Sequence, residues 1–533
     1  MIPDCISFRS IPHSSRIFLD YLAYAPDVRK FFPTSPDKEQ VIARAKELPR
    51  NLERQACVAE ILARQNRGWG ASEKTLANIE RLRNGAFAVV TGQQVGLFGG
   101  PLLSLLKAAS VLALAAEAET AGVDCVPIFW MASEDHDLAE INQALLLNQN
   151  FGLEPFAAQA VGQAESPVAT IRFAEGTNEL VDTVANLLGD SMAADYLRES
   201  YRDGETFPSA FAKLYSRIFA DYGLILIDPA DPELHQLARP LFADSVSRWQ
   251  ELNRSLLARN SELRDAQYHE QVKVTDESTL VFALVDGVRT PVHRVNGEFL
   301  FDRQKLKADE FLHRIQAAPE EFNANVLLRP ILQDYWLPTL GYIGGPAEIA
   351  YFAQTAVVYE KLLGRVTPIL PRLSATVLEP RIEKLLGKYK LELTELFHGE
   401  TELRDLLAVR ALPAELKQRF ADGRRAVEQA VSGISQSLAG LDKTLVEAAK
   451  RAASKMLYQM NRLEKRAAKA ELERAEIIAR HAMQIENSLY PRKTLQEREI
   501  SGLYFYAKYG PELIDRLIET AQVRCPEHKI VQL

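Results

Sequence analysis

Residues 86–142 constrain the fold of this chain more than any other stretch. The stretch opens with a short apolar run, residues 86–90, of the kind that forms a buried parallel strand. A glycine-rich loop follows, Pro101 then begins a helix-forming run over 102–119, and residues 126–131 form a second buried strand. These segments predict one βαβ unit with a right-handed crossover.

The loop after the first strand is the first candidate binding segment. Glycine lets the backbone approach a ligand closely, and the helix N-terminus offers free N–H groups to an anion. The spacing matches neither G-x-G-x-x-G nor G-x-x-x-x-G-K-[ST], so a plain tight turn remains an alternative. The candidate cofactor-binding residues here are Gly96, Gly99 and Gly100. The candidate substrate-binding residues are Thr91, Gly92, Gln93 and Gln94, of which the glutamines could recognise hydroxyl or amide groups.

A dense polar cluster follows the second strand. Carboxylates at such a strand end could bind an ammonium group or Mg²⁺, and an imidazole there could exchange protons near neutral pH. The same residues could instead cap a helix, where acids suit the dipole. A zinc site is disfavoured because no second histidine stands at ligand spacing. We predict catalytic roles for Asp135, His136 and Asp137, and substrate-binding roles for Glu134 and Asn142.

Later segments repeat the strand–helix pattern and predict an α/β fold with a Rossmann-like, doubly wound parallel sheet. Further core strands are expected at residues 224–227, 326–328, 339–343 and 366–370. Two mixed segments, near 143–205 and 265–325, are predicted insertions. The second contains hairpin signals at Asp286-Gly287 and Asn296-Gly297.

Two arginines beside prolines complete the predicted site. Arg329 and Arg372 could each clamp a carboxylate or phosphate, or could each serve as a salt-bridge partner. A Gly-Gly-Pro sequence before the helix over 346–363 could form the opposite wall. The remaining candidates are Gln333, Gly344, Gly345 and Glu348 for substrate and Ser374 for cofactor.

The C-terminal third has the pattern of a long helical arm. Apolar or small residues recur in steps of four and three, the period of a coiled-coil seam. The seam consists of Val427, Val431, Ile434, Leu438, Leu441, Leu445, Ala449, Ala452, Met456, Met460, Leu463, Ala467 and Ala470. A proline-free helix over 414–490 would span roughly 100 Å. We therefore expect a helical hairpin or arm, paired antiparallel with residues 385–425 or with another subunit, and a homodimer is the simplest reading.

These patterns predict four regions. Residues 1–85 form a helical region on the core, 86–380 the core, 381–490 the arm, and 491–533 a segment that returns to the core.

Bulk properties exclude several classes of protein. The net charge of −8 makes nucleic acid an unlikely partner, and the basic stretch 450–474 is more typical of a solvated coiled-coil face. The helix over 102–119 contains Lys107 and Glu117, which favours a core helix over a membrane span. The N-terminus has no signal-peptide pattern, and the four scattered cysteines favour a reducing compartment, so we expect a cytoplasmic protein.

Five stretches together resemble one family, the bacillithiol biosynthesis cysteine-adding enzymes. They are TGQQVGLFGGPLLSLLKA (91–108), PIFWMASEDHDLAEIN (127–142), RPILQDYWLPTLGYIGGPAEIAYFAQ (329–354), PILPRLSATVLEP (368–380) and LYPRKTLQERE (489–499). The resemblance implies a Rossmann-like core with inserted connecting segments and a coiled-coil arm. The core would be similar to class I aminoacyl-tRNA synthetase-like nucleotidyltransferases, although this chain lacks H-I-G-H and K-M-S-K-S.

The resemblance also implies a reaction, the joining of the cysteine carboxyl group to the amine of glucosaminyl-malate. Amide formation from a free carboxylate is uphill in water, so ATP, giving AMP or ADP, is the expected activator, and Mg²⁺ is a candidate companion. The alternatives are a related amino-acid ligase or nucleotidyltransferase with another acceptor, and a coiled-coil interaction protein with a degenerate core. The polar clusters at several strand ends argue against the last.

Overall fold

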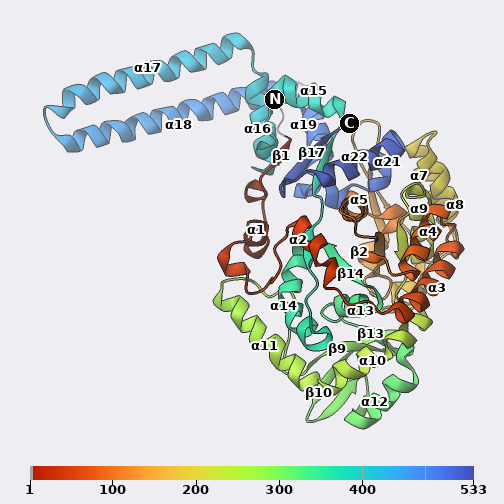
Figure 1. Cartoon of the computed structure of the whole chain (residues 1–533). Coiled ribbons are helices and arrows are strands. Elements are labelled where there is room, and N and C mark those ends of the chain that lie inside the picture. The colour runs from red at the N-terminus through yellow and green to blue at the C-terminus, as the bar shows by residue number, and fades with distance from the viewer. Residues whose placement is uncertain (1–3, 399, 475) are drawn as a thin grey trace.

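A five-stranded parallel sheet lies at the centre of the structure, a computed structural model that describes residues 4–398, 400–474 and 476–533 (Figure 1). The strand order is β15-β14-β2-β3-β8. The strands are β2 (Phe87–Gln93), β3 (Cys125–Met131), β8 (Ile225–Ile227), β14 (Thr339–Gly344) and β15 (Ile369–Pro371). The chain builds outward from β2 in one direction and then from β14 in the other. This is the predicted doubly wound arrangement, and its switch point lies between β2 and β14.

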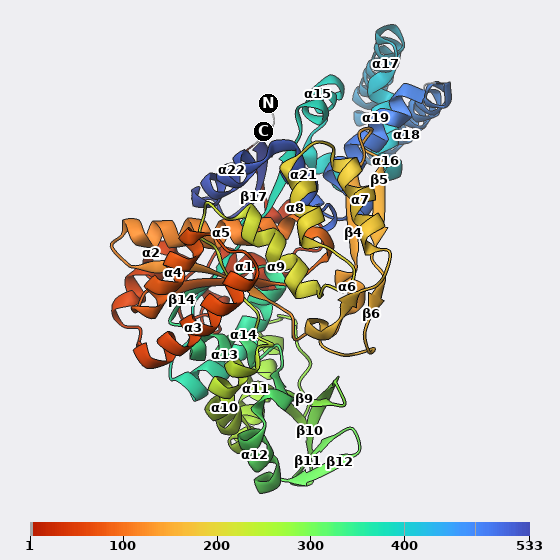
Figure 2. The same ribbon diagram turned by 90° about the vertical axis from the view of Figure 1, so that its right-hand side faces the viewer.

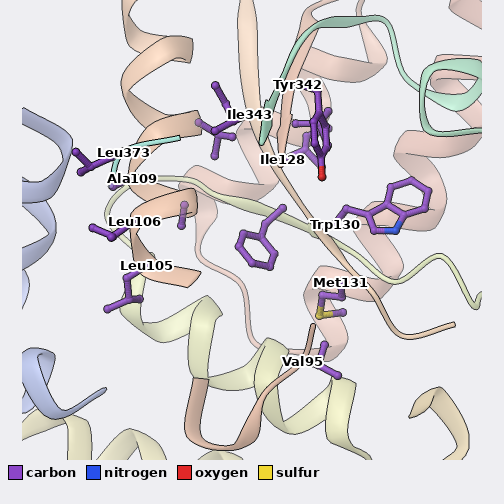
Figure 3. Packing of buried hydrophobic residues seen from close by; sticks show 14 of the residues in the cluster. Val95, Leu105, Leu106, Ala109, Ile128, Trp130, Met131, Tyr342, Ile343 and Leu373 are labelled. Atoms are coloured by element: carbon purple, nitrogen blue, oxygen red, sulfur yellow. The ribbon is translucent and has the colours of Figure 1, made fainter. Parts of the chain in front are cut away.

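Helices cover both faces of this sheet. α5 (Leu102–Thr120) connects β2 to β3, and α9 (Phe207–Ile218) precedes β8. α14 (Pro346–Leu363) connects β14 to β15, while α3 (Leu52–Gly68) and α4 (Glu73–Arg83) pack against β8. α5 is buried on almost every side because its residues are nearly all apolar. Figure 3 shows its Leu105, Leu106 and Ala109 within the same core as Ile128 of β3 and Ile343 of β14.

Two strand predictions need correction. β2 runs on through Thr91, Gly92 and Gln93, so these residues are paired with β3 and are not part of a loop. Residues 326–328 are a turn, because the side-chain oxygen of Asn325 accepts the N–H groups of Leu327 and Leu328, each at 3.0 Å. The apolar run therefore leads into α13 (Arg329–Trp336) and adds no strand to the core.

A first insertion follows β3 and carries short strands and helices. Its elements are α6 (Leu138–Ile141), β4 (Gln143–Leu147), β5 (Leu153–Ala157), β6 (Ala160–Val161), β7 (Arg172–Phe173), α7 (Thr177–Leu188) and α8 (Met192–Ser200). A second insertion forms an antiparallel sheet of order β12-β11-β10-β9-β13. Its strands are β9 (Ser278–Val285), β10 (Val288–Val295), β11 (Glu298–Phe301), β12 (Gln304–Lys307) and β13 (Phe322–Ala324). Both predicted hairpin turns are confirmed, and both have positive φ at their two central residues.

Three further helices accompany the second insertion. They are α10 (Pro232–Ser247), α11 (Trp249–Asp265) and α12 (Ala308–Ala317). Arg248 separates α10 from α11.

The arm is a helical hairpin that extends away from the rest of the molecule (Figures 1 and 2). α17 (Ala414–Ala439) and α18 (Lys443–Arg474) pack on each other, and α18 also packs on α16 (Glu400–Ala411). The single long helix considered from the sequence is wrong, because the chain turns at residues 440–442. At that turn the Asp442 carboxylate accepts the Thr444 N–H at 2.8 Å. Each helix of the hairpin is thus at most about 50 Å long.

Part of the predicted seam stays exposed on this hairpin. The exposed seam residues are Ile434, Leu441, Leu445, Met456 and Leu463. The side chain of Ala470 lies outside the described residues. The hairpin therefore leaves apolar surface uncovered within one chain.

The two ends of the chain meet beside the core. β17 (His528–Gln532) lies between β1 (Cys5–Ile6) and β16 (Ala375–Leu378) in a three-stranded sheet. The remaining helices are α1 (Arg16–Leu22), α2 (Lys38–Ala43), α15 (Pro380–Tyr389), α19 (Glu476–Leu489), α20 (Gln496–Glu499), α21 (Gly502–Tyr509) and α22 (Pro511–Gln522). α22 packs on α5 and brings the C-terminal segment back to the core. Within the described ranges, no helix is both long and apolar enough to span a bilayer.

Candidate active site

A cavity of about 710 Å³ opens at the carboxyl ends of β2 and β14, where the direction of winding reverses. This edge is where ligands bind in open α/β sheets. The core sheet, α11 and the antiparallel sheet contribute its walls. Its polar and charged lining includes Gln93, Gln94, Lys107, Glu134, Asp135, Glu140, Arg289, Arg329, Glu348, Arg372 and Arg498.

Glu134 forms a buried part of the acidic wall. Its Oε1 accepts hydrogen bonds from Asn323 Nδ2 at 2.5 Å and from His235 Nε2 at 3.0 Å. Burial alone would lower the pKa of His235, but the hydrogen bond and charge of Glu134 outweigh burial and raise the pKa above its usual value. His235 is therefore suited to hold the Glu134 carboxylate in place as an imidazolium.

Asp135 is held by one residue from each side of the cavity. Gln94 Nε2 donates to its Oδ2 at 2.6 Å, and the Arg289 guanidinium lies 3.2 Å from its Oδ1. Arg289 comes from β10, and burial lowers the pKa of its guanidinium. The second insertion thus supplies a cation to the acidic wall.

The rest of the predicted acidic cluster divides between capping and solvent. Asp137 caps α6 by accepting the Glu140 N–H at 3.1 Å, as the capping alternative predicts. His136 is exposed, with its Nδ1 3.3 Å from Arg289. Asn142 ends α6, and neither it, Asp137 nor His136 is part of the cavity lining. Glu140 does line the cavity, and partial burial of its carboxyl group, together with Asp137 and Asp135, raises its pKa.

Arg329 supplies positive charge on the opposite side. Its guanidinium donates to Gln333 Oε1 at 3.3 Å and to the hydroxyls of Tyr342 and Tyr351 at 3.4 and 3.1 Å. Gln333 is fully buried and positions Arg329 from one turn along α13. All of these partners are neutral, so the guanidinium can take an anionic ligand as its counter-ion.

Lys107 and Glu348 join the two strand–helix units in the wall of the cavity. Lys107 Nζ lies 2.6 Å from Glu348 Oε2 and donates to Gly92 O at 2.6 Å and to Gln93 Oε1 at 3.0 Å. Burial lowers the pKa of Lys107, and the charge of Glu348 raises it by less than burial lowers it. Burial alone would raise the pKa of Glu348, but the charge of Lys107 outweighs it and lowers that pKa. Thr91 is structural here, since its hydroxyl donates to Ile343 O across the sheet.

Three of the predicted loop glycines lie away from the cavity. The Gly99 N–H donates to the Tyr201 hydroxyl at 3.1 Å, and a Cβ on Gly96 would lie 2.8 Å from Gly100 Cα. The helix that follows is covered too, because Leu102 N–H donates to Ile500 O at 2.8 Å. Gly96, Gly99 and Gly100 are thus explained by packing, and the first N–H of α5 is already taken by a carbonyl of the chain itself.

A second cavity of about 340 Å³ adjoins the first. The two share Gly345, Pro346, Arg372 and Arg498 in their linings, and Gly344 and Ser374 line the second alone. Arg372 is paired with Glu497 at 2.5 Å, so its charge is already neutralised. Burial alone would raise the pKa of Glu497, but the charge of Arg372 outweighs it and lowers that pKa to about 2.

Ser374 belongs to the same buried network. Its hydroxyl bonds to Glu497 Oε1 at 2.9 Å and to His528 Nδ1 at 2.8 Å, and burial lowers the pKa of His528 to about 4. The salt-bridge alternative for Arg372 is therefore correct for this chain.

Several site residues were not predicted from the sequence. No sequence pattern marks Arg289 or His235 as a site residue, and only the fold brings them to the acidic wall. Lys107 had a signal, a lysine in the middle of an apolar helix, which indicates a buried partner. Glu140 and Tyr351 stand one turn from predicted residues on helices, a spacing that could have identified them.

The fold and this site define a Rossmann-like enzyme with a coiled-coil arm. Residues 1–373 match the family model described as bacillithiol biosynthesis BshC, N-terminal Rossmann-like domain, and residues 375–533 match its C-terminal coiled-coil domain. The chain therefore belongs to the bacillithiol biosynthesis BshC family, and it is an enzyme of the ligase class.

Curated relatives match over nearly their full length. A protein of Koribacter versatilis is 50% identical over all of both chains, and one of Solibacter usitatus is 36% identical over 99% of both. A third, of Salinibacter ruber, is 31% identical over 97% of this chain and 96% of its own. All three carry the name "Putative cysteine ligase BshC".

Proposed function

We propose that this protein joins the carboxyl group of L-cysteine to the amine of glucosaminyl-malate, with activation of the carboxylate by a nucleotide. The observation that carries the proposal is the pairing, in one cavity, of an acidic wall with an arginine that has only neutral partners. Both substrates carry an amine and at least one carboxylate, so each needs both kinds of wall.

The acidic wall suits the two amines. Glu134 and Asp135 are fixed by His235, Gln94 and Arg289, and would hold an ammonium group in a defined position. Glu140 stands beside them with a raised pKa, so its carboxylate is the better base for removing a proton from the attacking amine. We assign His136 and Asp137 lesser roles because they lie outside the cavity lining.

The opposite wall suits the malate carboxylates. Arg329 would bind one carboxylate, and the guanidinium fork favours a bidentate geometry. Gln93 and Gln94 would contact sugar hydroxyls from the end of β2.

ATP would supply the activation of the cysteine carboxylate. The second cavity suits a phosphate group, because Lys493 and Arg498 line it beside Ser374. In the described part of the chain, no three His, Cys, Asp or Glu side chains stand close enough to hold a metal ion. We therefore propose no set of protein ligands for Mg²⁺, and we assign no step of the reaction to it.

The arm would join two copies of the chain into a homodimer in the cytoplasm. The exposed Ile434 on α17 and Met456 on α18 belong to apolar surface that a second hairpin could cover.

The test is incubation of the purified protein with cysteine, glucosaminyl-malate, ATP and magnesium, followed by mass spectrometry. The proposal expects a conjugated thiol with an equal amount of AMP or ADP. A folded protein that consumes no ATP and forms no conjugate, in an assay validated with an active relative, would overturn it. A conjugate with a different amine would point to a related ligase.

Two substitutions, one in α6 and one just before it, separate the roles of Glu140 and His136. Glu140→Gln should lower kcat on the order of 100-fold, as expected for loss of a general base. His136→Asn is the matched control and should keep most of the activity. If His136→Asn lost activity and Glu140→Gln kept it, His136 would be the general base instead.

A further inference from the structure

The two chain ends bring two thiols together outside the proposed active site. Cys5 lies in β1 and Cys525 lies just before β17, and their Sγ atoms are 3.5 Å apart. Both residues are half-buried and both are free thiols. The other two cysteines are apart from this pair, Cys57 exposed on α3 and Cys125 buried in β3.

The surrounding backbone holds the two thiols in register. Cys5 pairs with Lys529 and Ile6 with His528 in the antiparallel ladder of β1 and β17. The Glu527 carboxylate accepts the Phe8 N–H at 2.6 Å and the Ser7 hydroxyl at 3.2 Å. The two sulfur atoms thus meet within an ordered junction, and little movement is needed to join them.

We propose that Cys5 and Cys525 form a reversible disulfide that fastens the N-terminal segment against the C-terminal strand. The oxidant is a peroxide. A thiolate attacks one peroxide oxygen, forms a sulfenic acid and releases hydroxide. The second thiol then attacks that sulfur and releases water. Overall, two thiols and one hydrogen peroxide give one disulfide and two waters.

The environments of the two thiols give the order of these steps. Burial alone would raise the pKa of Cys525, but hydrogen bonds from the Glu527 backbone and the Lys529 ammonium outweigh it and lower that pKa. The hydrogen bond with Cys525 raises the pKa of Cys5. Cys525 is therefore the attacking thiolate and Cys5 the resolving thiol.

The disulfide would act on the wall of the second cavity. Phe8, Ile11 and His13 line that cavity, and they lie on the segment that follows β1, the strand of Cys5. On the other side, Cys525 precedes His528, which bonds to Ser374 in the same cavity. Oxidation would thus fix this wall in place, and reduction would leave it held by hydrogen bonds and by the packing of Phe8 and its buried neighbours.

The test uses the full chain and a small excess of hydrogen peroxide, with peptide mapping under non-reducing conditions. A cross-linked Cys5–Cys525 peptide is expected in the wild type and in the control Cys57→Ser, with loss of the cross-link after dithiothreitol. Cys525→Ser and Cys5→Ser should give none. Sulfinic acid at Cys525 without a cross-link, or disulfides between chains only, would overturn the proposal.

A second readout tests the fastening itself. Oxidation should slow tryptic cleavage after the exposed Arg9 by about tenfold, because local opening of the N-terminal segment precedes cleavage. It should also raise the thermal midpoint of the wild type and leave that of Cys5→Ser unchanged. A cross-link that changes neither quantity would refute the fastening role. Both readouts are independent of ligase activity.

Discussion

Two strand–helix units of this protein look alike in sequence and differ in what they offer a ligand. β2 leads through glycines and Pro101 into α5, and β14 leads through Gly344 and Gly345 into α14. At α5 the first N–H donates to Ile500 O at 2.8 Å. At α14 the Gly345 N–H donates to the Glu348 carboxylate at 2.7 Å, beside the cavity.

The comparison teaches that a glycine-rich turn before a helix is not by itself an anion site. Here the backbone carbonyl of Ile500 and the side-chain carboxylate of Glu348 accept N–H groups that a phosphate takes elsewhere. Anion recognition in the cavity therefore falls to side-chain cations, of which Arg329 has only neutral partners.

The largest effect is expected from the ion pair that links the two units. Lys107→Met leaves the Glu348 carboxylate buried without its cation and should cost about 3–5 kcal/mol of unfolding free energy. Denaturant unfolding measures this loss. The double variant with Glu348→Gln should recover part of it, and a single-variant loss below about 1 kcal/mol would show that the pair does not join the units.

The C-terminal segment that covers α5 also carries a pH-sensitive group. Because burial lowers the pKa of His528 to about 4, only the unfolded chain takes up this proton as the pH falls from 6.5 toward 4. Stability is then lost with falling pH, by about 2 kcal/mol between pH 7 and pH 5. His528→Gln should flatten this part of the stability profile in denaturant titrations at both pH values. An unchanged slope would exclude His528 as its source.

A smaller effect is expected in the first glycine loop. Gly99 has a φ of 86°, and a Cβ there would lie 3.1 Å from Leu214 Cδ2. Gly99→Ala should therefore cost about 1–2 kcal/mol with KM unchanged. Gly122→Ala is the matched control, since its φ is 81° and no neighbour lies within 4 Å. A raised KM in Gly99→Ala would restore the loop as a ligand contact.

The smallest effect on stability is expected in the arm, where apolar side chains remain exposed on the hairpin. Ile434→Glu and Met456→Glu should change the unfolding free energy by no more than about 0.5 kcal/mol, because both side chains are already exposed. Sedimentation should nevertheless show loss of the dimer, while Ser437→Glu on the same helix keeps it. A monomeric wild type would contradict the dimer proposal.

The sequence predicted most of the core because its signals are local. Apolar runs of strand length and Gly-Pro boundaries located β2, β3, β8 and β14, and the Asp-Gly and Asn-Gly pairs located the hairpins. The prediction of a strand at 326–328 was wrong because the Asn325 side chain, and not the apolar residues of the run, determines the backbone conformation there. The turn at residues 440–442 was missed because apolar residues continue at the coiled-coil spacing through Leu441.

The site was less predictable because it depends on long-range contacts. Glu134 and Asp135 were identified from a strand end and Arg329 from its neighbouring proline, and the fold brings them to one cavity. Arg289 reaches Asp135 from 154 residues away, and Arg372 is neutralised by Glu497 from 125 residues away. No spacing within one motif encodes such pairs.

The most direct test is calorimetric titration of glucosaminyl-malate into the wild type, Arg329→Gln and Gly99→Ala. Loss of one charge-assisted, bidentate contact should weaken binding in Arg329→Gln on the order of 100-fold. Gly99→Ala should bind as the wild type does. Unchanged affinity in Arg329→Gln together with weakened binding in Gly99→Ala would contradict the account and return anion recognition to the glycine loop.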